Sequence, residues 1–81
     1  MELKLTAKRA MEFEERTGVD LLLYLKEVAA TGEISMKMMV ELFKSMGDGY
    51  TVDDFDNWQA PYTEKATAIM NAVKEFTEGK N

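Results

Sequence analysis

"SMKMMVELFKSMG", Ser35 to Gly47, is the stretch of sequence that decides the fold. Five of its apolar residues recur at spacings of three and four: Met36, Met39, Val40, Phe43 and Met46. This period places them on one face of a helix, and an apolar stripe of that kind usually faces a core. Ser35 is a preferred N-cap residue, and Gly47 stands where a helix commonly ends. The pattern predicts a central helix over residues 36–46.

Two shorter helices are predicted on the N-terminal side of this one. The first covers residues 7–16, with Thr6 as its N-cap, and the second covers residues 21–30, with Asp20 as its N-cap. Each is followed by a glycine, Gly18 and Gly32 respectively. The second helix carries a wide apolar stripe of Leu21, Leu22, Leu25, Val28 and Ala29.

A short helix over residues 52–59 is predicted next. Thr51 and Asp54 have the spacing of a capping box, with Asp in place of the usual Glu. Tyr50 and Phe55 stand where a hydrophobic staple has its pair. The start of this helix is therefore specified by local chemistry.

The last helix is predicted over residues 63–77, after a break at Pro61. Its apolar residues again recur at three and four: Ala66, Ile69, Met70, Val73 and Phe76. Residues 1–5 are expected to form an N-terminal arm and residues 78–81 a frayed tail. The expected fold is an all-α, single-domain bundle of four to five helices with short capped turns, over residues 1–81.

Length and composition are those of one small globular domain. The chain has 81 residues, of which 46% are hydrophobic and 31% charged. Its longest apolar run, Leu21 to Leu25, is far too short to cross a bilayer. The first ten residues lack the apolar stretch of a signal peptide, so the expected location is the cytoplasm, with no membrane partner.

Residue usage restricts the chemistry of the chain. It contains no cysteine and no histidine, which excludes thiolate and imidazole catalysis and the usual zinc sites. Fifteen acidic residues against ten basic ones, a net charge of -5, disfavour nucleic-acid binding. We expect no enzymatic activity and no cofactor, and the expected partner is another protein.

"GDGYTVDDF", Gly47 to Phe55, resembles half of a calcium loop. If Gly49 takes the glycine position of an EF-hand, however, the main ligand positions fall on Lys44, Met46 and Phe55, which cannot serve. The nearby acids Asp53, Asp54 and Asp56 are those that a first helical turn favours. The stretch is interpreted as a turn and a helix start, with no metal site.

Three apolar or aromatic residues are candidates for protein binding. Met38 and Leu42 lie four apart and flank the predicted stripe of the central helix, and Tyr24 lies on the outer side of the second helix. Methionine-rich exposed surfaces adapt to varied partners. We expect Tyr24, Met38 and Leu42 to be exposed for contact with a partner.

"LKLTAKRAMEFEERTGVDLLLYL", Leu3 to Leu25, resembles the start of the small tail assembly chaperones of siphophages and prophages. The matching residues are Leu5, Thr6, Phe13, Glu14, Glu15, Thr17, Gly18, Leu21, Leu22 and Leu25. "TEKATAIMNAVKEF", Thr63 to Phe76, is similar to the closing helix of that family. These motifs are helix caps and leucines rather than a chemical signature.

The resemblance implies an all-helical protein that keeps the tape measure protein soluble and recruits major tail tube protein subunits to it. Such chaperones act in the host cytoplasm and are absent from the mature virion. Self-association on a long client is expected. Related genes often encode a second, longer product by ribosomal slippage, and Lys80-Asn81 fits the coding of a slippery stretch.

The main alternative is a small acidic adaptor or regulatory protein of prophage or bacterial origin. A helix-turn-helix around residues 31–35 is disfavoured, because the following helix offers only Lys37 and Lys44 as basic residues, against Glu41. A tape measure gene immediately downstream is expected only for the chaperone.

Overall fold

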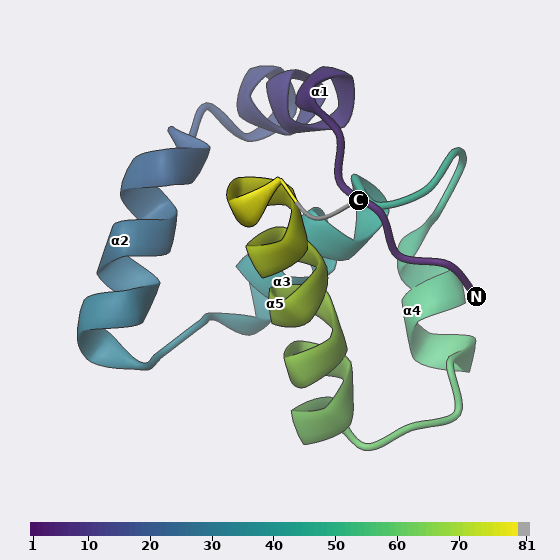
Figure 1. Ribbon diagram of the computed structural model, residues 1–81. Helices are drawn as coiled ribbons and strands as arrows, with labels where there is room; N and C mark the ends of the chain where they lie inside the picture. The colour runs from purple at the N-terminus through teal and green to yellow at the C-terminus, as the bar shows by residue number, and fades with distance from the viewer. Residues whose placement is uncertain (80–81) are drawn as a thin grey trace.

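The computed structural model describes residues 1–79, and within them five helices follow one another along the chain (Figure 1). They are α1 (Ala7–Thr17), α2 (Leu21–Thr31), α3 (Met36–Lys44), α4 (Val52–Asn57) and α5 (Tyr62–Glu78). The described part of the chain has no strand, which confirms the all-α prediction. The expected frayed tail, residues 78–81, is wrong at its start, because Glu78 is the last residue of α5 and Gly79 is its C-cap. Lys80 and Asn81, which carry the expected slippage site, lie outside the described residues.

Side-chain caps start four of the helices as predicted. The side-chain oxygens of Thr6, Asp20, Ser35 and Thr51 each accept a hydrogen bond from the backbone N–H three residues later, over 3.1–3.3 Å. At α4 the capping box is complete, because Asp54 also accepts from the backbone N–H of Thr51 at 2.9 Å. Polar side chains thus satisfy N–H groups that a helix start leaves without partners.

Glycines end α1 and α2, but not α3. Gly18 and Gly32 have φ values of 72° and 71°, the left-handed conformation that closes a helix. The prediction that Gly47 ends the central helix is wrong, because α3 stops at Lys44. Gly47 instead leaves room for the ring of Tyr50, which any Cβ at position 47 would overlap.

The core is built around α3, which packs against α1, α4 and α5. Met39, Leu42 and Phe43 of α3 are buried. The ring of Phe43 stacks on Tyr50 at 5.1 Å and meets Phe55 edge-on at 5.4 Å, measured between ring centroids. The other buried apolar residues are Leu5, Phe13, Leu21, Met46, Ile69, Ala72 and Val73.

Met36 does not join this core. The apolar stripe predicted a buried side chain, but Met36 is 49% exposed at the first position of α3. The prediction for Met36 is therefore wrong, whereas those for Met39 and Met46 are confirmed.

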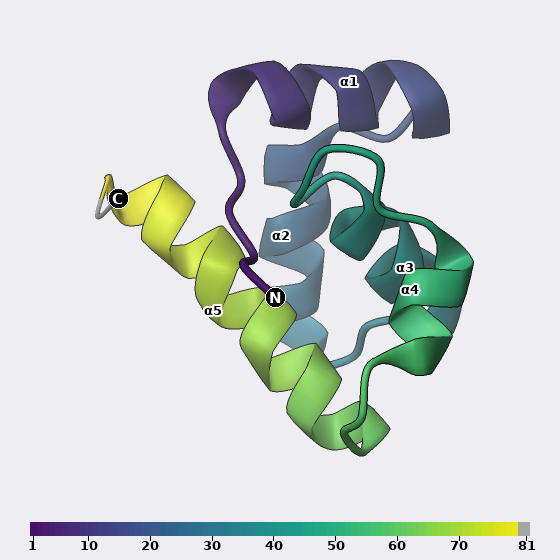
Figure 2. The ribbon, with the colours of Figure 1, turned by 90° about the vertical axis from the view of Figure 1, so that its right-hand side faces the viewer.

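The N-terminal arm is part of the packed structure. Leu5 is buried, the backbone N–H of Lys4 donates to the carbonyl oxygen of Met46 at 3.0 Å, and the hydroxyl of Tyr50 donates to the carbonyl oxygen of Glu2 at 2.6 Å. In Figure 2 the arm descends from α1 beside α5. It thereby joins the start of the chain to the turn after α3.

Candidate protein-binding surface

Helix α2 is the most apolar of the helices and nevertheless lies largely outside the core. Among the helices it packs only against α1, and Leu21 is its one buried residue. Leu22 and Leu23 are 59% and 57% exposed. Five consecutive apolar or aromatic residues, 21–25, point in all directions around a helix, so a single neighbour cannot cover them. Figure 1 shows α2 standing at one side of the molecule.

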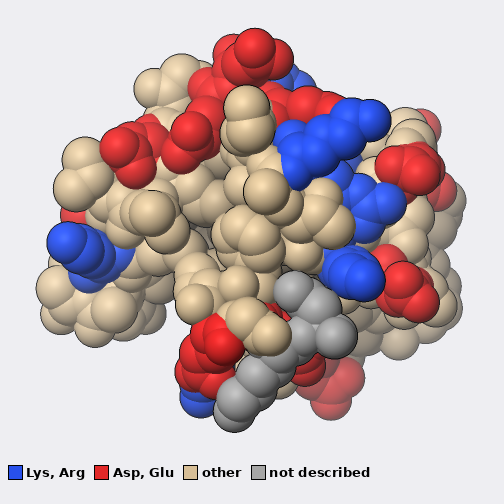
Figure 3. All heavy atoms as spheres, turned by 45° about the horizontal axis from the view of Figure 1, so that its top comes forward, with Lys and Arg blue, Asp and Glu red and all other residues tan. Residues whose placement is uncertain are grey.

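An open groove of about 450 Å³ separates α2 from α5. Its walls carry Leu22, Leu25, Lys26, Val28 and Ala29 from α2, and Met70, Val73, Lys74 and Thr77 from α5. Val73 is buried and lies at the base, whereas Leu22 is exposed at the rim. Figure 3 shows the surface hollowed between the lobe formed by α2 and the rest of the molecule.

The charge of the groove is opposite in sign to that of the chain. Its two charged lining residues are Lys26 and Lys74, and no acidic residue lines it. Within residues 1–79 the ion pairs are Arg9–Asp48, Arg16–Glu41 and Lys44–Glu41, and neither groove lysine takes part in them. The groove is therefore apolar and basic in a chain of net charge -5.

A second, open hollow of about 700 Å³ lies beside the turn between α2 and α3. Tyr24, Val28 and Ile34 supply its apolar lining, and Glu27 and Glu33 supply acidic groups. Val28 borders both hollows, so α2 is open on two sides.

The three predicted contact residues do not form one surface. Tyr24 is half-buried and lines the hollow beside the α2–α3 turn. Met38 is half-buried and packs against the core. The expectation that Leu42 is exposed is wrong, because its side chain is 0% exposed. Helix α3 has neighbours on three sides, and its buried face is therefore wider than the stripe predicted from the sequence.

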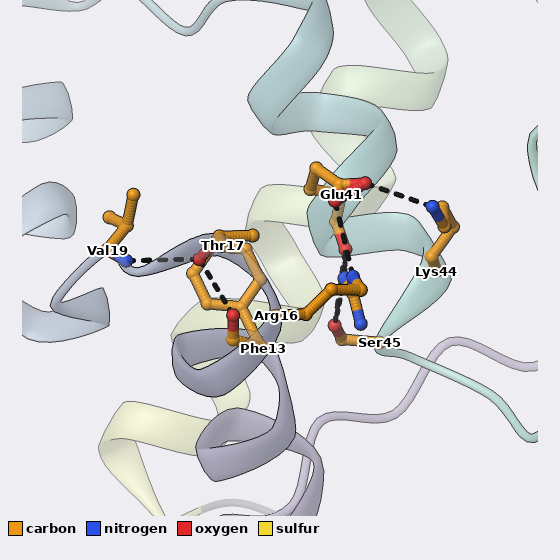
Figure 4. A network of polar contacts seen from close by, with 7 residues as sticks. All are labelled: Phe13, Arg16, Thr17, Val19, Glu41, Lys44 and Ser45. Carbon is orange, nitrogen blue, oxygen red and sulfur yellow. Dashed lines mark hydrogen bonds and ion pairs between the residues drawn. The ribbon is translucent and has the colours of Figure 1, made fainter.

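A polar network connects α1 to the end of α3 (Figure 4). Arg16 donates to the carboxylate of Glu41 at 3.2 Å, to the carbonyl oxygen of Glu41 at 2.8 Å and to the hydroxyl of Ser45 at 3.0 Å. Lys44 donates to the other oxygen of the Glu41 carboxylate at 3.1 Å. Burial acts to raise the pKa of Glu41, but the hydrogen bonds from Lys44 and Arg16 and their positive charges hold that pKa below its ordinary value.

A buried lysine is the feature that sequence reasoning missed. Lys65 in α5 is 3% exposed, and its Nζ donates to the carbonyl oxygen of Phe55 at 2.6 Å. The same Nζ lies 4.5 Å, 5.1 Å and 5.9 Å from the ring centroids of Phe55, Tyr62 and Trp58. These contacts close the corner between α4 and α5. The aromatic residues spaced around Ala60-Pro61 are the sequence signal that accompanies this site.

Two of the acidic residues after α3, Asp48 and Asp54, have structural partners. Asp54 serves the capping box of α4, and Asp48 pairs with Arg9 at 3.1 Å. Within residues 1–79 no group of three acidic side chains is arranged to hold a metal ion. Asp54 thus acts in helix capping and Asp48 in ion pairing.

In the described part of the chain, no helix combines the length and the apolar character that a membrane span requires. Comparisons of the chain with protein-family models, with curated proteins and with solved structures found no significant match.

Proposed function

We propose that this chain is a phage tail assembly chaperone, which binds and solubilises the tape measure protein and helps to recruit tail tube subunits, without catalysis. The observation that carries the proposal is the exposed apolar surface of α2 with the groove beside it. Surfaces of this kind receive the apolar face of an amphipathic helix.

The energetics favour a partner on this surface. Full burial of one leucine side chain stabilises by about 1.5–3 kcal/mol. Leu22 and Leu23 are each more than half exposed on the same helix, so a client that covers them gains stability that the isolated chain lacks. Contiguous exposed apolar surface on a small domain commonly marks an interaction site.

The resemblance to tail assembly chaperones falls on the same part of the molecule. Its two segments, Leu3–Leu25 and Thr63–Phe76, contain Leu22 and Leu25 of one groove wall and Met70, Val73 and Lys74 of the other. The segments that resemble the family therefore contribute to both walls. A tape measure protein is long and helical, and several copies of the chain are proposed to bind along it.

Co-expression with the tape measure protein encoded beside this gene tests the proposal. The chain is expected to increase the soluble fraction of the tape measure protein and to co-purify with it. Leu22→Asp should abolish both effects, because it places a carboxylate at the groove rim. Met11→Asp is the matched control, since Met11 is 65% exposed on α1 and does not line the groove.

Two results would overturn the proposal. One is a tape measure protein that stays insoluble and does not co-purify with the chain. The other is a gene neighbourhood without tail genes, which would favour the adaptor alternative.

A further inference from the structure

We infer that the groove between α2 and α5 selects an amphipathic helix whose apolar stripe is bordered by carboxylates on both sides. The inference rests on the proposed function and specifies the chemistry of the client segment. It is carried by the arrangement of the two groove walls.

The two walls repeat one pattern. On α2, Leu22, Leu25, Lys26 and Ala29 stand at positions i, i+3, i+4 and i+7. On α5, Met70, Val73, Lys74 and Thr77 stand at the same spacings. Such positions share one face of a helix, so each wall presents one lysine among apolar and small residues, and α2 adds Val28 to its wall.

The two helices run in roughly opposite directions, as the colours of Figure 1 show. The lysine of each wall is therefore near the middle of the groove. An occupant between the walls has Lys26 on one flank and Lys74 on the other. The alkyl stems of such lysines cover apolar surface, while their ammonium groups reach outward to the solvent edge. Carboxylates on both flanks of an apolar stripe are the groups that complement this arrangement.

Charge also favours a separate chain over a second copy as the occupant. Each copy carries a net charge of -5, and two such copies repel each other. Locally, the groove is basic and lacks acidic lining residues. The net charge of the chain also opposes an acidic client, so the preference for an acid-bordered segment rests on Lys26 and Lys74, the charged residues that line the groove.

The test uses two synthetic helical peptides of about 18 residues, long enough to form a helix on binding. Both carry leucines at spacings of three and four, and one has glutamates on both flanks where the other has lysines. Binding to the full chain is measured by fluorescence anisotropy, and the site is located by amide chemical shifts in NMR spectra. The glutamate peptide should bind roughly threefold to tenfold more tightly, the effect of two exposed charge pairs.

Charge reversal provides the decisive comparison. The double variant Lys26→Glu, Lys74→Glu should reverse the preference in favour of the lysine peptide. The control variant Lys8→Glu, Lys37→Glu makes the same change of net charge at exposed residues outside the groove and should keep the original preference.

Three outcomes would overturn the inference: equal binding of the two peptides, shift changes away from α2 and α5, or a dimer of the chain that occupies the groove and is lost in the reversed variant. These outcomes are separable from failure of the proposed function. If the tape measure protein is still solubilised when the peptide preference is absent, only the groove inference fails. If the preference is present but the tape measure protein is not solubilised, only the chaperone assignment fails.

Discussion

Helices α2 and α3 are of similar length and both are rich in apolar residues, yet α3 is largely buried and α2 is largely exposed. Helix α3 buries Met39, Leu42 and Phe43 between three other helices. Helix α2 buries only Leu21 and packs only against α1. The apolar residues of α3 are concentrated toward its neighbours, whereas those of α2 surround its axis. Apolar content alone therefore does not decide burial, and the surplus on α2 is surface that a partner can use.

The largest loss of folding stability is expected for a substitution in the buried face of α3. Phe43→Ala removes a fully buried ring that contacts Tyr50, Phe55 and Trp58, and it should destabilise the fold by about 3–5 kcal/mol. Urea unfolding followed by Trp58 fluorescence measures the loss. A loss below about 1 kcal/mol would mean that α3 is not the centre of the core.

The second-largest loss of stability is expected at the corner between α4 and α5, where Lys65 is buried. Lys65→Ala leaves the carbonyl oxygen of Phe55 without the 2.6 Å hydrogen bond and should destabilise the fold by about 1–3 kcal/mol. Lys74→Ala is the matched control on the same helix, because Lys74 is exposed, and its unfolding midpoint should stay near that of the parent. If both substitutions changed the free energy of unfolding equally, burial of Lys65 would not contribute to stability.

A smaller, pH-dependent effect is expected at the link between α1 and α3. Glu41→Gln weakens the contacts with Arg16 and Lys44 and should cost about 1 kcal/mol at neutral pH. The folded-state pKa of Glu41 lies below its ordinary value, so this stabilisation is present above the unfolded-state pKa. It is lost as the pH falls through the folded-state pKa.

Urea unfolding of the parent and Glu41→Gln chains across pH 3–7 checks that the stabilisation by Glu41 is lost as the pH falls. The difference between the two free energies of unfolding should begin to shrink as the pH falls to the ordinary pKa of a glutamate, about 4.3, and should close as the pH falls through the lower folded-state pKa of Glu41. A difference that stays constant down to pH 3 would show that ionisation of Glu41 does not stabilise the fold.

The smallest effect on stability is expected on α2. Leu22→Ser changes a side chain that is 59% exposed and should alter the free energy of unfolding by no more than about 0.5 kcal/mol. The same variant should bind a leucine-rich helical peptide more weakly. A large loss of stability would place Leu22 in the core and remove the contrast between α2 and α3.

The helix starts were predictable because their causes are local. Thr6, Asp20, Ser35 and Thr51 each cap an N–H group three residues away, so a short window of sequence contains the whole interaction. The end of α3 was not predictable in this way. The local pattern placed that end at Gly47, but α3 stops at Lys44, and Gly47 instead lies against the ring of Tyr50.

The candidate surface was less predictable, because exposure is decided by neighbours that are remote in sequence. Tyr24 was expected to be exposed and is half-buried, and the apolar stripe of α2 gave no indication that the helix borders open hollows on two sides. Leu42 is buried because three helices surround α3. Lys65 is buried because the corner between α4 and α5 places the rings of Phe55, from α4, and Tyr62, from α5, beside its Nζ. The spacing of apolar residues within one helix does not predict which of these neighbours will pack against it.

The packing of α2 on α1 also bears on the order in which the molecule folds. These two helices are consecutive, and contacts between near neighbours in the chain form faster than remote ones. The N-terminal arm, in contrast, is fixed by the hydrogen bond between Tyr50 and Glu2, 48 residues apart. An early α1–α2 hairpin would carry only one wall of the groove, since the other belongs to α5. If the proposed function is correct, a client that contacts both walls therefore binds only after α5 has packed into the core.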